Sequence, residues 1–330
     1  GRKNSSGRGG KKGRRAPGDT MVQEKKKRQG GSGRRRGGAP VFIPWFLAFL
    51  IAAGAMLYQR LTGPTYPLRG SVRVGERVVP YKLPRTGLSP AGGEETIDLL
   101  LPAAGLDEPP VLHWRRHPTE DDFTRLTMER REGKEGEEPH YVAGLPAQPA
   151  AGKVAYYITL GERARIPPAA ESLVVLRCKN PVDPELLIPH VGLMVLAMIF
   201  GVRAALAALT GSPVLARWSW LTLVAMTGGV ALFGPLVQKQ AFGAYWTGWP
   251  LGGDWTDNKG AVMWLAWLLC CLLLARLRGR APGVRRLAVA LAALVMLAAF
   301  AIPHSLFGSE LDYARVEQGV EPAEAVRTGR

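Results

Sequence analysis

The chain has 330 residues, of which 47% are hydrophobic, and its formal net charge at pH 7 is +16. Most of this charge is local, because residues 1–38 hold fourteen Lys or Arg and two Asp or Glu, a net charge of +12. No aromatic residue is interleaved with these charges, which argues against nucleic acid as a partner. Of the three cysteines, Cys270 and Cys271 share one apolar run, so a disulfide framework is excluded.

Residues 1–40 are rich in Gly, Ser, Lys and Arg, and we expect them to form a disordered basic cytoplasmic tail. A basic segment directly before an apolar run stays in the cytoplasm under the positive-inside rule. The run that follows, residues 41–58, predicts a transmembrane anchor helix. The small residues 52–55 also allow a cleaved signal peptide, but the run continues through Tyr58 and so favours the anchor.

Four further apolar runs cover residues 187–209, 218–237, 261–274 and 287–302, so the sequence predicts a membrane α-helical bundle of about five transmembrane helices. Several arginines fall on loops or helix ends assigned to the side of the basic tail: Arg203, Arg217, Arg276, Arg278, Arg280, Arg285 and Arg286. We therefore expect an inner-membrane protein of a bacterium, with residues 59–186, the loop 238–260 and the tail 304–330 outside the cytoplasm. The lipid bilayer is its first predicted partner.

Residues 59–186 show short apolar runs separated by Gly, Pro and charge, the pattern of an all-β sandwich inserted between the first helix and the four-helix bundle 187–303. The predicted strands are residues 70–74, 95–101, 110–115, 125–129, 141–145, 153–160 and 172–178.

Three stretches of this region, residues 111–116, 144–149 and 153–158, resemble an immunoglobulin or fibronectin domain. In such domains a buried Trp and a Tyr-rich late strand fill the core. The resemblance implies a surface for an extracytoplasmic protein partner rather than a site of chemistry.

Five of the nine tryptophans lie between Trp246 and Trp267, and Trp246, Trp249 and Trp255 precede the fourth predicted span. One interpretation is an aromatic belt at the membrane interface.

The belt does not explain the polar residues of the same loop. Thr256, Asp257 or Asn258 could cap the next helix. The loop has too few carboxylates to favour a hard cation.

The stretch from Phe242 to Trp246, followed by Trp249 and Asp254, is similar to the tryptophan-rich loop of the cytochrome c assembly family. That family's motif reads Trp-Gly-x-x-Trp-x-Trp-Asp, and Phe242 stands here for the first Trp. In the family, two histidines flank the loop at a distance of two spans on each side. Here His190 opens the second span and His304 follows the fifth, each directly after a proline.

This resemblance implies that His190 and His304 are axial ligands of a haem b iron. Trp246, Trp249, Asp254 and Trp255 would lie against the macrocycle, and Lys239 or Lys259 could pair with its propionates. Each histidine on its own could instead cap a helix end.

We therefore expect a non-enzymatic protein that binds or hands over haem on the extracytoplasmic face. The alternative is a scaffold subunit of a cell-envelope complex, since no nucleotide loop, zinc signature or Ser/His/Asp set occurs. A transporter is disfavoured, because the spans carry almost no charge beyond Arg203. The C-terminal tail should be structured over residues 305–313 and frayed after Arg315.

Overall fold

The computed structural model describes residues 42–328, apart from residues 90–95, 104–105, 107, 134–137, 163, 170 and 305. The predicted basic tail, residues 1–40, lies outside the described residues.

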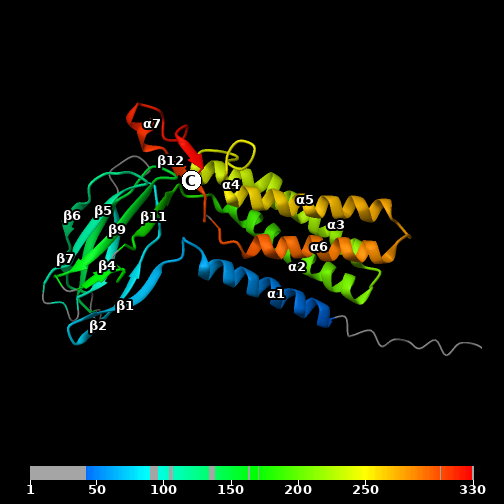
Figure 1. Ribbon diagram of the computed structural model, residues 1–330, viewed down its shortest axis with the longest axis horizontal. Helices are drawn as coiled ribbons and strands as arrows, with labels where there is room; N and C mark the ends of the chain where they lie inside the picture. The colour runs from blue at the N-terminus through cyan, green and yellow to red at the C-terminus, as the bar shows by residue number, and fades with distance from the viewer. Residues whose placement is uncertain are drawn as a thin grey trace, which may run out of the picture. The chain divides into compact units, whose positions relative to one another are not determined.

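Five helical segments of the described chain are long and apolar enough to cross a membrane, which confirms the number predicted from the apolar runs (Figure 1). The third segment is one continuous rod made of α3, the π-helical turns η1 and α4. The segments are α1 (Phe42–Thr62), α2 (Pro184–Thr210), α3 (Leu215–Met226), η1 (Thr227–Phe233), α4 (Gly234–Phe242), α5 (Trp255–Arg276) and α6 (Pro282–Ala301).

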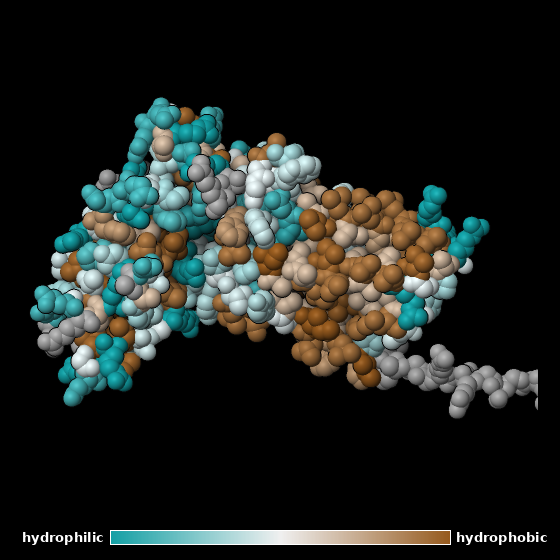
Figure 2. All heavy atoms as spheres, in the orientation of Figure 1, coloured by the Kyte–Doolittle hydropathy of each residue, from teal (hydrophilic) through white to brown (hydrophobic). Residues whose placement is uncertain are grey.

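The helix α2 lies at the centre of the bundle, where it packs against α1, α3 and α6. Small residues allow this close approach. A Cβ atom on Gly201 of α2 would come within 2.6 Å of the Met296 side chain of α6. On α1, Ala48 and Ala52 are fully buried. The hydrophobic surface of these helices forms the broad apolar region of Figure 2.

The β domain contains a hairpin and two sheets, all formed between α1 and α2 in the chain (Figure 1). The hairpin joins β1 to β2, one sheet has the order β3-β11-β9-β5-β6 with β10 beside β9, and the other has the order β4-β8-β7. The strands are β1 (Leu68–Val74), β2 (Arg77–Leu83), β3 (Thr86–Leu88), β4 (Thr96–Pro102), β5 (Val111–His117), β6 (Thr124–Thr127), β7 (Glu129–Arg131), β8 (His140–Pro146), β9 (Lys153–Leu160), β10 (Ala164–Ile166) and β11 (Val174–Lys179).

Both sheets and the hairpin contribute to one hydrophobic core. Leu99 of β4 and Leu145 of β8 are fully buried, as are Leu112 of β5 and Ile158 of β9. In β2 and β4, buried residues alternate with exposed ones, as a pleated strand with one face on the core requires. The predicted run 125–129 forms two strands, β6 and β7, which belong to different sheets.

The C-terminal segment is ordered well beyond Arg315, so the expectation of a frayed end is wrong. Strand β12 (Ser309–Leu311) pairs with β13 (Val326–Thr328), and the helix α7 (Tyr313–Glu317) lies between them. This segment has a small hydrophobic core of its own, formed by Leu311, Tyr313 and Ala325. The polar composition after Arg315 did not indicate this order, because the core depends on the pairing of β12 with β13, whose partners are fifteen or more residues apart in the sequence.

Candidate ligand-binding site

A cavity of about 780 Å³ lies where the helix bundle meets the β domain. Its wall is formed by the end of α1, the starts of α2 and α5, the η1–α4 rod, the residues around the end of α6, the turn from β2 into β3, and the end of β11. Sites for small molecules and cofactors typically enclose roughly 300–1,000 Å³. The cavity is therefore large enough for a cofactor, and both His190 and His304 line it.

The His190 ring, near the start of α2, is oriented by a hydrogen bond. Its Nδ1 lies 3.0 Å from the carbonyl oxygen of Gly229 in η1. A carbonyl oxygen only accepts, so Nδ1 carries the hydrogen and donates it. The other ring nitrogen, Nε2, then keeps its lone pair. Ligating histidines are commonly oriented by such a bond from their second ring nitrogen to a backbone carbonyl.

Two consecutive glycines bring η1 close enough for this bond. A Cβ atom on Gly229 would lie 2.7 Å from the Met194 sulfur, and one on Gly228 would lie 2.9 Å from a methyl carbon of Leu193. Both neighbours belong to α2, the helix that carries His190. Larger residues in η1 would push the two helices apart. Single π-helical turns of this kind occur frequently at functional sites.

His304 lies in the loop that follows α6, where it lines the cavity and keeps an exposed surface. Burial lowers the pKa of this ring to about 3, and the positive charges near it, foremost that of Lys259, lower it in the same direction. The ring is consequently neutral at physiological pH. A neutral imidazole is the form that ligates metals.

Only one of the three predicted tryptophans reaches the cavity. Trp246 lines it, and its indole N–H donates to the carbonyl oxygen of Trp249 at 3.1 Å. Trp249 itself is 77% exposed, and Trp255 packs on Phe307 with ring centroids 5.4 Å apart. The tryptophan-rich loop thus presents one indole to the cavity and two to its surroundings.

Asp254 lies at the edge of the cavity, but its carboxylate is occupied by protein donors. One oxygen accepts the backbone N–H of Thr256 at 2.7 Å and so caps α5. The other oxygen accepts the backbone N–H of Ser309 at 2.9 Å, the Ser309 hydroxyl at 3.0 Å and the Thr247 hydroxyl at 3.2 Å. Asp254 therefore connects the loop, α5 and the C-terminal segment.

The expected caps of α5 were Thr256, Asp257 or Asn258, and this expectation is wrong, since Asp254 caps the helix. Asp257 instead holds the loop through one carboxylate oxygen, which accepts the backbone N–H groups of Thr247 and Gly248 at 2.7 and 3.1 Å. The Asn258 side chain accepts the backbone N–H of Trp249 at 2.7 Å. The sequence alone does not show which of these residues caps α5 and which bind the loop, because Asp, Asn and Thr have similar capping ability.

The cavity wall is strongly positive. Five cationic side chains line it, Arg60, Arg85, Arg177, Lys179 and Lys259, against the two carboxylates of the α5 region. Of these five, only Lys259 was expected from the sequence, and its ammonium group donates to the carbonyl oxygen of Ile302 at 2.7 Å. Lys239, the other predicted cation, is not on the wall and donates to the Gly243 carbonyl oxygen.

The C-terminal segment ties the β domain to the bundle beside the cavity. Arg177 of β11 donates to the Ser309 carbonyl oxygen at 2.7 Å, and Ser309 also binds Asp254 at the start of α5. Burial lowers the pKa of the Arg177 guanidinium, while the charges of Asp254 and Glu310 raise it. The two halves of the molecule are thus joined through one buried polar cluster at the cavity's rim.

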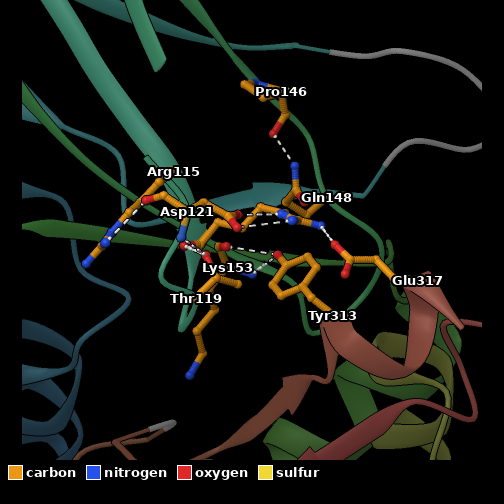
Figure 3. A network of polar contacts seen from close by, with 9 residues as sticks. Arg115, Thr119, Asp121, Pro146, Gln148, Lys153, Tyr313 and Glu317 are labelled. Atoms are coloured by element: carbon orange, nitrogen blue, oxygen red, sulfur yellow. Dashed lines mark hydrogen bonds and ion pairs between the residues drawn. The ribbon is translucent and has the colours of Figure 1, made fainter. Parts of the chain in front are cut away.

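Figure 3 shows how α7 continues this attachment onto the sheet. The Tyr313 hydroxyl accepts the backbone N–H of Lys153 at 3.0 Å and donates to its carbonyl oxygen at 2.9 Å. Arg116 lies between the carboxylates of Asp121 and Glu317, each 2.7 Å away. These last two pairs are partly exposed, so each contributes only about 0–1 kcal/mol.

Within the described residues, no group of three or more His, Cys, Asp or Glu side chains is gathered as it would be around a bare metal ion. The two cavity histidines are the only described histidines on this wall. In comparisons with known proteins, no family model matches the chain, and no curated protein matches it significantly.

Proposed function

We propose that this protein binds haem b in the cavity, with His190 and His304 as ligands of the iron, and holds or hands over the haem without chemistry of its own. One observation carries the proposal: two imidazoles that are 114 positions apart in the sequence line the same cavity. Neutral imidazole is a common ligand of haem iron.

The residues present fit this group. The Nε2 atom of His190 keeps its lone pair because Nδ1 donates to the Gly229 carbonyl. His304 is kept neutral by its surroundings. The apolar part of the wall includes Met194, Met263 and the Trp246 indole, which suit the flat face of a macrocycle. Bound haem would supply an iron that His190 and His304 could hold through their imidazole nitrogens.

The arginines at the end of the bundle away from the β domain support an assignment of the side of the membrane that the cavity faces. Arg276 ends α5, and Arg278 and Arg280 lie in the turn that leads to α6. Under the positive-inside rule that end would face the cytoplasm of a bacterial inner membrane. The β domain and the cavity would then lie on the extracytoplasmic side, where haem is delivered to exported proteins.

The test is a haem titration of the full-length protein, purified in a neutral detergent and followed by its visible absorption. We expect saturable binding with a sharp Soret band. His190→Ala and His304→Ala should each weaken binding at least tenfold, and the double variant should abolish the band. His140→Ala, in β8 and off the cavity wall, is the matched control. A band that survives the double variant unchanged would refute this function.

The second candidate is a scaffold subunit whose β domain, proposed to be immunoglobulin-like, docks a protein partner. It is favoured by apolar side chains exposed on strands: Val78 is 58% exposed, Leu88 53% and Leu100 52%. Where exposed apolar side chains form one contiguous patch, they mark a site of interaction with another protein. Purification from membranes in mild detergent discriminates, since a scaffold subunit should elute with a stoichiometric partner and a haem carrier need not.

A further inference from the structure

We infer that the ligand of this cavity carries anionic groups, and that Arg60, Arg85 and Lys179 bind them at the wall that the β domain and the end of α1 supply. The β domain is then part of the binding site rather than a separate module. For haem, the anionic groups would be the propionates, and to that extent the inference rests on the proposed function.

The wall of the cavity carries more positive than negative side chains. Two carboxylates face five cations, and both carboxylates already have partners. Asp254 accepts from Thr256, Ser309 and Thr247, while Asp257 accepts from Thr247, Gly248 and Gln238. Neither carboxylate forms an ion pair with a cation of the wall, among the residues described. The cavity therefore has an uncompensated positive charge.

Three of the five cations on the wall have no anionic partner among the described residues. Arg177 and Lys259 donate to backbone carbonyls, as described above. Over the described part of the chain, Arg60, Arg85 and Lys179 form no ion pair and no side-chain hydrogen bond, and Arg60 only approaches the Tyr66 ring, at 5.8 Å. Burial lowers the pKa of Arg85, so keeping it charged without a partner has a cost. A bound anion would offset that cost.

Side chains on two of the helices that line the cavity are ordered from charged to apolar. On α1, Met56 lies one turn deeper in the bundle than Arg60, and on α5, Met263 lies one turn deeper than Lys259. The cations are thus at the β-domain end and the apolar side chains below them. This arrangement fits an amphiphile whose flat or aliphatic body enters the bundle and whose acidic groups remain at the sheet. Haem and long-chain carboxylates share this chemistry.

The experiment compares charged and neutral forms of the same ligands on the full-length protein in dodecyl maltoside. One arm titrates haem and haem dimethyl ester by visible absorption. The other titrates palmitate and hexadecanol by quenching of tryptophan fluorescence, since Trp246 is on the wall. The variants are Arg85→Met and Lys179→Met, and the control is Arg73→Met, an exposed arginine of β1 that is off the wall.

We expect haem to bind about tenfold or more tightly than its dimethyl ester, because a hydrogen bond to a charged group contributes about that factor. Arg85→Met and Lys179→Met should remove most of this difference without moving the Soret band, and Arg73→Met should leave it unchanged. Equal affinities for haem and its ester, unaffected by the variants, would overturn the inference while haem binding itself stood.

The palmitate arm separates the two proposals. If no Soret band forms but palmitate binds at least tenfold more tightly than hexadecanol, and this preference depends on Arg85 and Lys179, the inference holds and the haem function fails. If palmitate and hexadecanol bind alike or not at all, and haem shows no dependence on these cations, the inference is overturned.

Discussion

The carboxylate of Asp254 joins three segments around the cavity, and its replacement by Asn should loosen them. The side chain is only 3% exposed. One oxygen accepts from Thr256, and the other accepts from Ser309 and Thr247. An Asn side chain keeps one acceptor oxygen, and its NH₂ group must then face a backbone N–H at one of the two positions.

The magnitude follows from the bonds that are lost. If the amide NH₂ takes the place of the oxygen that binds Ser309, the buried Ser309 N–H loses its acceptor, which costs roughly 1–3 kcal/mol. The upper end of this range, about 3 kcal/mol, corresponds to roughly a hundredfold increase in the population of molecules in which the C-terminal segment is locally opened.

Asp257→Asn is the matched control, three residues away. Its four protein donors all bind one oxygen, Oδ2, so an amide can place its NH₂ group at the position of the other oxygen. We expect a loss of about 1 kcal/mol or less, because the bonds become neutral but are not broken.

Hydrogen–deuterium exchange of residues 306–317 in detergent, followed by mass spectrometry, measures this opening directly. We expect exchange in the Asp254→Asn protein to be roughly a hundredfold faster than in the parent, and in the Asp257→Asn protein less than tenfold faster. Equal exchange in the two variants would refute the assignment of Asp254 as the connecting residue.

Three further predictions concern the ligand. In a His190→Ala background, haem affinity should change less than twofold between pH 7.5 and pH 5, because the pKa of His304 is lowered to about 3. A histidine of ordinary pKa would become protonated over this range, and haem affinity would then fall about 30-fold, which would contradict the prediction. Trp246→Ala should weaken haem binding roughly 3- to 10-fold and Trp249→Ala less than twofold, since only the first indole lines the cavity; the reverse order in the titrations would count against this site. Gly229→Ala places a methyl group 2.7 Å from the Met194 sulfur and should weaken haem binding roughly tenfold by separating η1 from His190, an effect that an unchanged titration curve would exclude.

The five long helices could be predicted from the sequence because apolar runs of this length have few other uses. Their ends could not. The helix α1 continues four residues past Tyr58, and there the Gln59 amide donates to the Phe300 carbonyl oxygen of α6, a contact that only tertiary packing creates. The third predicted span contains the π-helical η1, and Pro235 follows it directly, where a proline inside the continuous rod removes one backbone N–H donor.

Strand β2 was missed because Pro80 lies in its middle. The strand tolerates this proline because it belongs to a two-stranded hairpin with a free edge. The buried positions Val79, Tyr81 and Leu83 still alternate as a strand requires, but three apolar residues are a weak signal beside a proline.

Five residues named from the sequence share the cavity wall: His190, His304, Trp246, Asp254 and Lys259. Each lies at or beside the end of an apolar run. The sequence did not identify Arg85 or Lys179. They lie in ordinary strand and turn sequence, and nothing local distinguishes them from other surface cations. Arg85 and Lys179 come to line the same cavity only because the β domain folds against the helices.

The central claim is that His190 and His304 bind one ligand in one cavity. The most direct measurement is the electron paramagnetic resonance spectrum of the ferric protein with one equivalent of haem. We predict a low-spin signal that requires both imidazoles, and a high-spin signal in His190→Ala and in His304→Ala. A spectrum that is the same in the parent and in both single variants would contradict the claim.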